Sequence, residues 1–503
     1  MANKKLNVNT NKDVLYKKGL WALGWFLVIW GIILRSLYFL SNPPILSDVI
    51  RTYYVLKDIS FLDVFKLGSS IHTFLHDPQG ILIIEKALFT LWGNSEYILR
   101  LCTFLCGCLS VVIFRKIKDQ FVGTYAGIVA LALFSSSFWL ILFSVDENCY
   151  SSDLVVTMLL YMLFLHMSHC KINHKKILAF SMAAGLSCWF SLPAIFILGG
   201  GFLSLFIVTI FDKQNRQRLW AYGIVFSVSF ISFAYYYVTA LINFRTGGLA
   251  HVFLPHFMPI HGSLTYVIVW LKEHFYFMFL NPLSLSPFLG IFFWVIGMVK
   301  LLKDNKMKGL ILLLPFILML GASAMRGYPY WQRTVIFLAP AFYLIIARGW
   351  EYLFLKEKEK YMPLISIFLL LFLFYNPLRP SLPFFSLKHK PHPMISIQNK
   401  IKLNFRKGDI IYVGDQVKWE FLYYVERTGL EEDKYYIQKK AGDFIFDTNK
   451  TKYKRIWYIS RASSEEQILK ILYKLNRIGA CVSAEGKEYV TYLYMAQEPD
   501  RHK

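Results

Sequence analysis

Reactive polar side chains are concentrated between the first two hydrophobic segments, in residues 41–96. This stretch carries Asp48, Arg51 and the run His76-Asp77-Pro78 directly outside an apolar segment. Carboxylates, guanidinium groups and imidazoles are the groups that move protons or bind anions in proteins. Next to a bilayer, they could act on a substrate dissolved in the lipid. Their placement therefore indicates an enzyme whose chemistry takes place at the lipid boundary.

The composition shows what must hold these groups in place. The 503 residues are 56% hydrophobic, with a mean hydropathy of +0.42, well above the values of soluble domains. Apolar stretches long enough to cross a hydrocarbon core of about 30 Å recur from Leu20 to Tyr375, whereas the remainder is water-soluble in composition. We therefore predict a polytopic α-helical membrane domain, residues 1–375, and a small α/β domain, residues 376–503.

The net charge of +23 does not indicate a nucleic-acid partner. Much of the Lys and Arg lies in short connections between apolar segments, where it sets membrane orientation. No zinc-finger, helix-turn-helix or RNA-recognition motif accompanies the charge. The seven cysteines show neither a disulfide framework nor zinc spacing.

About eleven apolar segments are candidate spans, and the basic connections alternate between them. The positive-inside rule then predicts a cytoplasmic N-terminus in the cytoplasmic (inner) membrane of the cell. An odd number of spans puts residues 41–96 and the α/β domain on the extracytoplasmic side. The candidate spans are 20–40, 97–114, 121–143, 154–167, 177–191, 194–211, 219–241, 285–302, 310–325, 335–347 and 361–375; the basic connections are 115–118, 170–176, 212–218, 300–308 and 348–360.

The tail alternates between strand and helix patterns. Residues 408–414 and 454–460 have strand patterns, residues 416–427 and 465–477 have helical ones, and residues 481–495 form strands around a turn at Glu485-Gly486-Lys487. No phosphate-binding glycine fingerprint is present, so no nucleotide is assigned to this domain.

A second outer loop, residues 243–284, contains His251, His256 and His261. Their interval of five does not place them on one helix face, and prolines interrupt the series. We assign no metal ligands, and the sequence neither requires nor excludes a divalent metal ion.

Three stretches resemble the GT-C class of integral-membrane glycosyltransferases, especially the bacterial relatives of protein O-mannosyltransferases and the lipid A aminoarabinose transferases. The first is Pro43 to Arg51, with Arg35 near the outer end of the preceding span. The second runs from His76 to Gly80 and continues in Gly93 to Leu101, which fits a G-x-S-E-x-x-x-R pattern. The third is Arg333 to Gly349. The chain departs from the class at Val49, where a second acid is usual, and in Asp146 to Tyr150, where an Arg-x-Tyr element is usual.

The resemblance implies an inverting glycosyltransferase with a polyprenyl-phosphate-linked sugar as donor and a lipid, glycan or protein as acceptor. Such transfer needs a base for the acceptor hydroxyl, cations for the leaving phosphate and groups that hold the sugar. Asp48 is the predicted base, and Arg51, Arg333 and Arg326 are the predicted phosphate ligands. The residues predicted to hold the sugar or the acceptor are His76, Asp77, Asp146, Glu147 and Asp153.

Each assignment has a structural alternative. Asp48 could cap a helix, and Arg51, three residues on, could simply pair with it. Arg326 and Arg333 could extend to the interface from span ends, and the acids could be solvated turn residues. At the level of function, the alternatives are a lipid-linked glycan flippase or transporter, and an inactive transferase scaffold in envelope glycan assembly.

Overall fold

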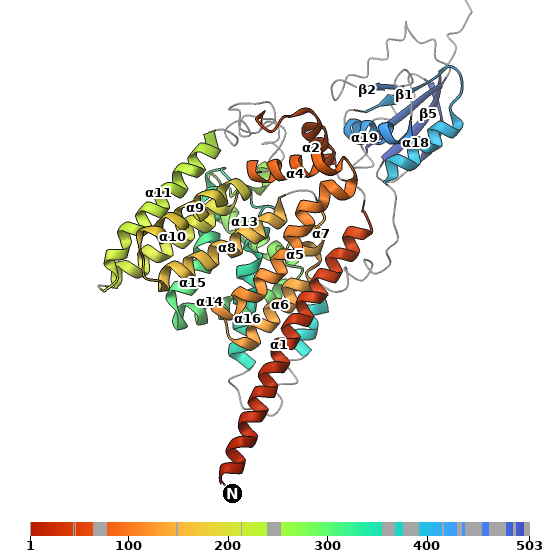
Figure 1. Cartoon of the computed structure of the whole chain (residues 1–503). Helices are drawn as coiled ribbons and strands as arrows, with labels where there is room; N and C mark the ends of the chain where they lie inside the picture. The colour runs from red at the N-terminus through yellow and green to blue at the C-terminus, as the bar shows by residue number, and fades with distance from the viewer. Residues whose placement is uncertain are drawn as a thin grey trace, which may run out of the picture. The chain divides into compact units, whose positions relative to one another are not determined.

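The structure is a computed structural model in which the chain divides into two compact units (Figure 1). The helical unit comprises Met1–Ser41 and Val55–Lys388, and the sheet unit comprises Asn42–Tyr54 and His389–Lys503. The domain boundary predicted after Tyr375 lies next to residues that are not described. The structure describes residues 2–43, 45, 47–63, 78–146, 149–212, 214–238, 253–354, 368–375, 392–414, 417–429, 435–437, 455–461, 479–485 and 489–496.

The helical unit is built from α-helices joined by short connections. Residues 368–375 are also helical, and three short 3-10 helices, Arg216–Arg218, Leu254–His256 and Ile336–Leu338, lie between the longer elements. The α-helices are α1 (Ala2–Leu40), α4 (Gln79–Trp92), α5 (Glu96–Phe121), α6 (Thr124–Ser136), α7 (Phe138–Leu142), α8 (Tyr150–His169), α9 (His174–Phe190), α10 (Ala194–Phe211), α11 (Leu219–Tyr236), α13 (Leu264–Leu280), α14 (Pro287–Asp304), α15 (Lys306–Ala324) and α16 (Ala339–Phe354). Helix α2 (Ser47–Asp58) begins in the sheet unit and ends in the helical unit.

Within the described residues, seven helices are long and apolar enough to cross a membrane. The protein is therefore a multi-pass membrane protein, and the predicted fold class is confirmed. The segment 121–143, which we predicted as one span, differs from the prediction. It forms two helices, α6 and α7, separated by Ser137.

Polar residues fix where several helices begin. Ser95 accepts a hydrogen bond from the amide of Ile98 and caps α5, which explains the serine of the G-x-S-E-x-x-x-R pattern. Asn173, Ser263 and Asn305 cap α9, α13 and α15 in the same way. These caps satisfy amides that have no partner inside the helix.

Helix α16 lies at the centre of the helical unit, and 83% of the residues in its apolar window are buried. Its crossing with α14 depends on Gly297 and Gly349. A Cβ atom at Gly297 would lie 1.8 Å from the carbonyl oxygen of Ile345, and one at Gly349 would lie 2.0 Å from that of Phe293. The two backbones can approach this closely only because both side chains are absent.

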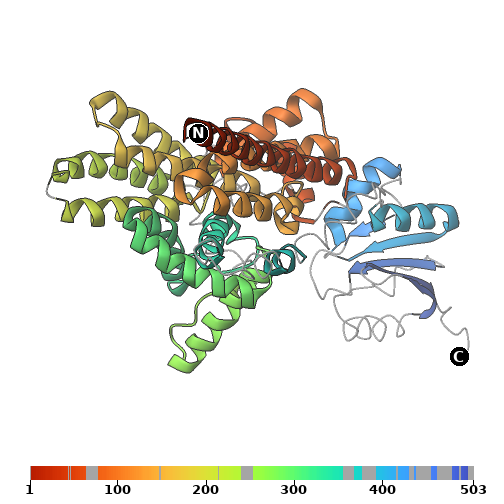
Figure 2. The same ribbon diagram turned by 90° about the horizontal axis from the view of Figure 1, so that it is seen from below.

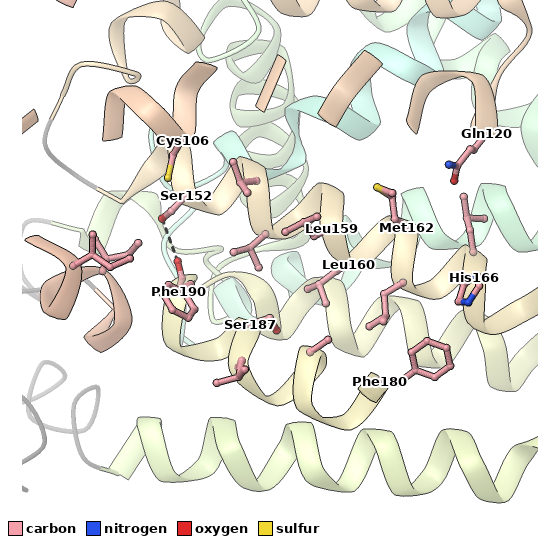
Figure 3. A pocket seen from close by; sticks show the side chains of 18 of the residues that line it. Cys106, Gln120, Ser152, Leu159, Leu160, Met162, His166, Phe180, Ser187 and Phe190 are labelled. Atoms are coloured by element: carbon pink, nitrogen blue, oxygen red, sulfur yellow. Dashed lines mark hydrogen bonds between the residues drawn. The ribbon is translucent and has the colours of Figure 1, made fainter. Parts of the chain in front are cut away.

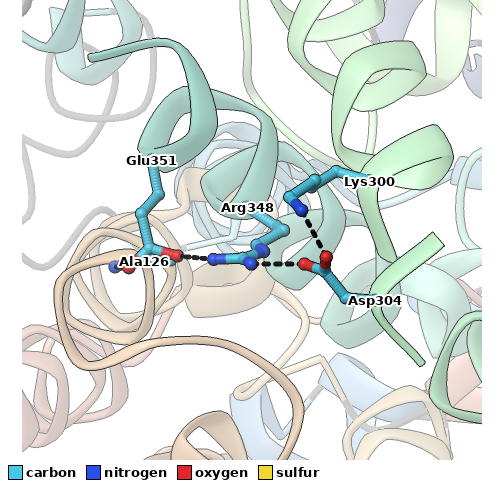
Figure 4. A network of polar contacts seen from close by, with 5 residues as sticks. All are labelled: Ala126, Lys300, Asp304, Arg348 and Glu351. Atoms are coloured by element: carbon cyan, nitrogen blue, oxygen red, sulfur yellow. Dashed lines mark hydrogen bonds and ion pairs between the residues drawn. The ribbon is translucent and has the colours of Figure 1, made fainter. Parts of the chain in front are cut away.

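An ion-pair network joins α14, α16 and α6 (Figure 4). Arg348 binds both Glu351 and Asp304, and Asp304 also binds Lys300. Glu351 in turn accepts a hydrogen bond from the amide of Ala126 in the first turn of α6, at 3.3 Å. Charged residues of two predicted basic connections, 300–308 and 348–360, therefore link three helices.

The sheet unit contains a five-stranded sheet in the order β2-β1-β3-β5-β4. Strand β1 pairs in parallel with β2 and β3, while β5 pairs antiparallel with β3 and β4. Helices α18 (Pro393–Asn404) and α19 (Lys418–Thr428) pack against each other along one side of the sheet (Figure 2). The strands are β1 (Asp409–Val413), β2 (Tyr435–Ile437), β3 (Arg455–Arg461), β4 (Gly479–Glu485) and β5 (Tyr489–Ala496).

Strands β1, β3, β4 and β5 and helix α19 match the predicted tail pattern, whereas α18 and β2 were not predicted. The predicted helix at residues 465–477 lies outside the described residues. Asp409, at the start of β1, accepts hydrogen bonds from Arg455 and Trp457 of β3, which ties the two parallel strands together.

Candidate functional site

The predicted site residues fall in different parts of the structure. Asp48 and Arg51 lie in the first half of α2, within the sheet unit, and their side chains are not described. His76, Asp77 and Glu147 lie outside the described residues. The remaining four, Asp146, Asp153, Arg326 and Arg333, belong to the helical unit and can be placed there.

The α2 segment that carries Asp48 packs against α19. Tyr53 donates a hydrogen bond to Glu426 at 3.1 Å, and its ring lies 5.0 Å from that of Tyr423. Asp48 is the second residue of α2, a position at which helices favour an acidic residue.

In the helical unit, the start of α8 meets the segment between α15 and α16. Asp153, in the first turn of α8, is only 4% exposed. Burial raises the pKa of Tyr328 well above its ordinary value, and the negative charge of Asp153 raises it further. The Tyr328 phenol therefore stays protonated, and it donates a hydrogen bond to the carbonyl of Thr334 at 2.7 Å. Two of the predicted segments, 146–153 and 326–333, are thus brought together.

Arg333 and Arg326 have different environments. The Arg333 guanidinium is half-buried and lies 6.0 Å from the ring centre of Tyr150, the first residue of α8. Arg326 is exposed, in a turn where its φ is +54°. Arg333 therefore lies beside the first residue of α8, whereas Arg326 lies at the protein surface.

A second group of polar residues lies where the C-terminal end of α1 meets the N-terminal end of α5. Tyr38 of α1 interacts electrostatically with both Arg100 of α5 and Asp146. Arg100 is 3% exposed, although it lies next to the long apolar stretch of α5 that begins at Leu101. It is the arginine of the G-x-S-E-x-x-x-R pattern. In this protein the arginine is buried close to Tyr38 of α1, so it helps to hold α1 and α5 together.

A groove of about 960 Å³ runs along α8 (Figure 3). Its walls are mostly apolar and come mainly from α5, α8 and α9, with Ile81 and Ile84 of α4 at one end; the polar lining residues include His169 and Lys308. Ser152 lies at that end and donates a hydrogen bond to the carbonyl of Phe190 at 3.1 Å, while Gln120 and His166 lie at the other end. The 20 residues of α8 extend roughly 30 Å, about the thickness of a hydrocarbon core. The groove can therefore hold a long apolar chain across most of the membrane.

The outer-loop histidines do not gather around a metal. His251 lies outside the described residues, and His261 is exposed. The rings of His256 and His274 lie 6.1 Å apart, and His256 packs on Trp331 with ring centres 3.6 Å apart. Burial and the charge of His274 lower the pKa of His256 to about 4, so it is neutral near pH 7. Across the described ranges, no group of three His, Cys, Asp or Glu residues could hold a metal ion.

The prediction missed Glu85, Tyr328 and the groove. Glu85 is 5% exposed on α4, one turn after Ile81 and directly after Ile84 of the groove wall. The neighbouring Lys86 donates a hydrogen bond to the carbonyl of Leu56 at 2.6 Å. A single acid inside the apolar run Ile81 to Phe89 was the available signal, because a buried carboxylate is costly unless it has a role.

By sequence, the chain matches no protein-family model and no curated protein. By structure, it is similar to ArnT from Cupriavidus metallidurans, which is an aminoarabinose transferase. The apo form matches with a TM-score of 0.53 and the form bound to undecaprenyl phosphate with 0.55. Each comparison has 11% identity and covers 94% of this chain and 98% of the other.

A further similar structure is the apo oligosaccharyltransferase of Archaeoglobus fulgidus, with a TM-score of 0.50 and 11% identity over 80% of this chain and 63% of the other. Both proteins are GT-C glycosyltransferases. The chain therefore has the GT-C fold, and the predicted resemblance to the aminoarabinose transferases is confirmed at the level of the fold.

Proposed function

We propose that the protein is an inverting glycosyltransferase that moves a sugar from a polyprenyl-phosphate carrier to an acceptor at the extracytoplasmic face of the cytoplasmic membrane. The observation that carries this proposal is the apolar groove along α8, one end of which is lined by Ser152, the residue that precedes the buried acid Asp153. The shared fold supports it, because ArnT, which has that fold, binds undecaprenyl phosphate. A lipid, a glycan or a protein could serve as the acceptor.

In this proposal the isoprenoid tail lies in the groove, and its phosphate lies at the end formed by α4 and Ser152. Arg333 and Arg51 bind the phosphate, with Arg326 at the rim, and Asp146 and Asp153 hold sugar hydroxyls together with His76, Asp77 and Glu147. Asp48 takes the proton of the acceptor hydroxyl. The acceptor oxygen then bonds to the anomeric carbon while the bond from that carbon to the phosphate oxygen breaks, and polyprenyl phosphate leaves.

Filling the groove tests the donor assignment. Ala183 lines the groove, whereas its neighbour Met182 is 57% exposed and does not. In Ala183→Trp the indole occupies space needed by the tail, and we expect the KM for a polyprenyl-phosphate sugar to rise about tenfold with little change in kcat. The measurement is steady-state transfer of a labelled sugar in detergent, with Met182→Trp as the matched control. Equal KM values in the two variants would remove the groove from the proposal.

The two outer arginines are predicted to behave differently. We expect Arg333→Gln to lower kcat/KM for the donor about 100-fold, because a cation near the leaving phosphate stabilises the developing charge. The exposed Arg326 should tolerate the same change with an effect of less than about threefold. Both variants can be compared in one transfer assay. A larger loss in Arg326→Gln than in Arg333→Gln would contradict this assignment.

A further inference from the structure

Arg35 of α1 is completely buried inside a membrane span, with a relative exposure of 0%. One of its terminal nitrogens donates hydrogen bonds to the carbonyls of Gly31, at 2.9 Å, and Ser135, at 3.3 Å. Its Nε and its other terminal nitrogen have no hydrogen-bond partner in the part of the chain that the structure describes. Burying a guanidinium group in a membrane protein is costly, so a buried arginine of this kind indicates a specific role.

The role is suggested by where α6 ends. Helix α6 stops at Ser136, Ser137 is extended with φ −63° and ψ 119°, and α7 begins at Phe138. The first backbone hydrogen bond after the break runs from the amide of Ile141 to the carbonyl of Ser137, at 3.0 Å. The last carbonyls of α6 therefore lose their usual helical donors, and in a membrane such groups must be satisfied by other parts of the protein.

Arg35 supplies what this helix end lacks. It donates to the Ser135 carbonyl in the last turn of α6, and its positive charge lies at the negative end of the helix dipole. Gly31 makes the approach possible, because a Cβ atom there would lie 3.0 Å from the Cβ of Ser135. The sequence at the break contains neither proline nor glycine, but it contains Ser135, Ser136 and Ser137, which favour a helix end, and the arginine from α1 satisfies a carbonyl at that end.

The break directs the chain toward the candidate site. After α7, the amide of Asp146 donates to the carbonyl of Leu142 at 3.2 Å, and Ser151 of α8 donates to the carbonyl of Phe143 at 3.0 Å. These bonds connect α7 to the first turn of α8, which carries Asp153. Helix α1 packs against both α6 and α7. The position of the turn that carries Asp146 and Asp153 therefore depends on how α6 ends.

We propose that Arg35 is a positioning residue: it stabilises the break between α6 and α7 and thereby places the turn from Asp146 to Asp153. It acts through the backbone at Ser135 and does not itself contact substrate. The consequence for catalysis rests on the proposed function, whereas the consequence for the α6–α7 break does not.

The test compares Arg35→Met, which removes every donor, with Arg35→Lys, which keeps the charge. Arg115→Met is the matched control, because Arg115 packs on Trp21 and Trp25 of α1, ten or more residues before Arg35 in the same helix. Hydrogen exchange measured on the full-length protein in detergent should be about tenfold faster over residues 137–146 in Arg35→Met. In Arg35→Met, the other helices should keep their wild-type exchange rates. At residues 137–146, Arg115→Met should exchange at the wild-type rate, and Arg35→Lys should exchange at a rate between those of the wild type and Arg35→Met.

Activity gives a second readout. With a labelled polyprenyl-phosphate sugar, we expect kcat of Arg35→Met to fall about 100-fold with an unchanged donor KM, because the groove is intact and only the turn is misplaced. Unchanged exchange over residues 137–146, or faster exchange spread evenly over the helices, would overturn the positioning role. If Arg35→Met does not accumulate as folded protein, hydrogen exchange over residues 137–146 is compared between Arg35→Lys and the wild type. Faster exchange in Arg35→Lys supports the positioning role, and unchanged exchange overturns it. A wild-type protein that uses no donor would defeat the proposed function, while the exchange data would still decide the role of Arg35.

Discussion

Replacement of Asp48 by asparagine is expected to lower sugar transfer by about 100- to 10,000-fold, the range by which a general base accelerates reactions. Asparagine keeps the size of the side chain but cannot accept the proton of the acceptor hydroxyl. Donor binding should change little, because the predicted donor ligands are intact. The measurement is the initial rate of transfer from a labelled polyprenyl-phosphate sugar at saturating donor.

Asp58 provides the control for this experiment. It is an exposed acid at the opposite end of α2, so Asp58→Asn changes the charge of the same helix without touching the proposed base. Asp58→Asn should therefore transfer the sugar at close to the wild-type rate. Full activity of Asp48→Asn would eliminate Asp48 as the base and direct attention to the buried Glu85.

The largest expected loss of stability comes from the crossing of α14 and α16. In Gly297→Ala the new Cβ would lie 1.8 Å from the carbonyl oxygen of Ile345, so the two helices must move apart. Overpacking of this kind typically costs about 1–3 kcal/mol, and more where backbone atoms are in the way. We expect a clearly lower midpoint of thermal unfolding and a smaller yield of folded protein in detergent.

Gly223→Ala is the matched control, because that glycine lies within α11 and a Cβ there would meet nothing within 4 Å. Alanine is a better helix former than glycine, so this variant should be at least as stable as the wild type. Similar unfolding midpoints for the two variants would show that the helices can separate without cost, contrary to the prediction.

The sequence was sufficient to predict elements whose signal is local. Apolar length predicted the membrane helices, and alternation of residues predicted β1, β3 and the hairpin of β4 and β5. Ser95 could be recognised as part of a motif because a helix cap is formed by residues close in sequence.

Features that depend on distant residues could not be predicted. The break at Ser137 lies in a segment whose length and hydropathy fit a single span, and its proposed stabiliser, Arg35, lies about one hundred positions earlier. The neighbourhood of Asp153 and Tyr328, and the groove shared by α5, α8 and α9, arise only when the helices pack. The assignments of Asp48, Arg51, His76, Asp77 and Glu147 remain predictions.

The composition of the sheet unit has a consequence for biosynthesis. Residues 42–54 emerge from the ribosome early, but their packing partners on α19, Tyr423 and Glu426, are made more than 300 residues later. This unit therefore cannot be completed during translation until almost the entire chain has been inserted. A separately expressed tail would also lack Tyr53 and present an unpaired aromatic surface to water, so attempts to produce that fragment should include the early segment as a fused or added peptide.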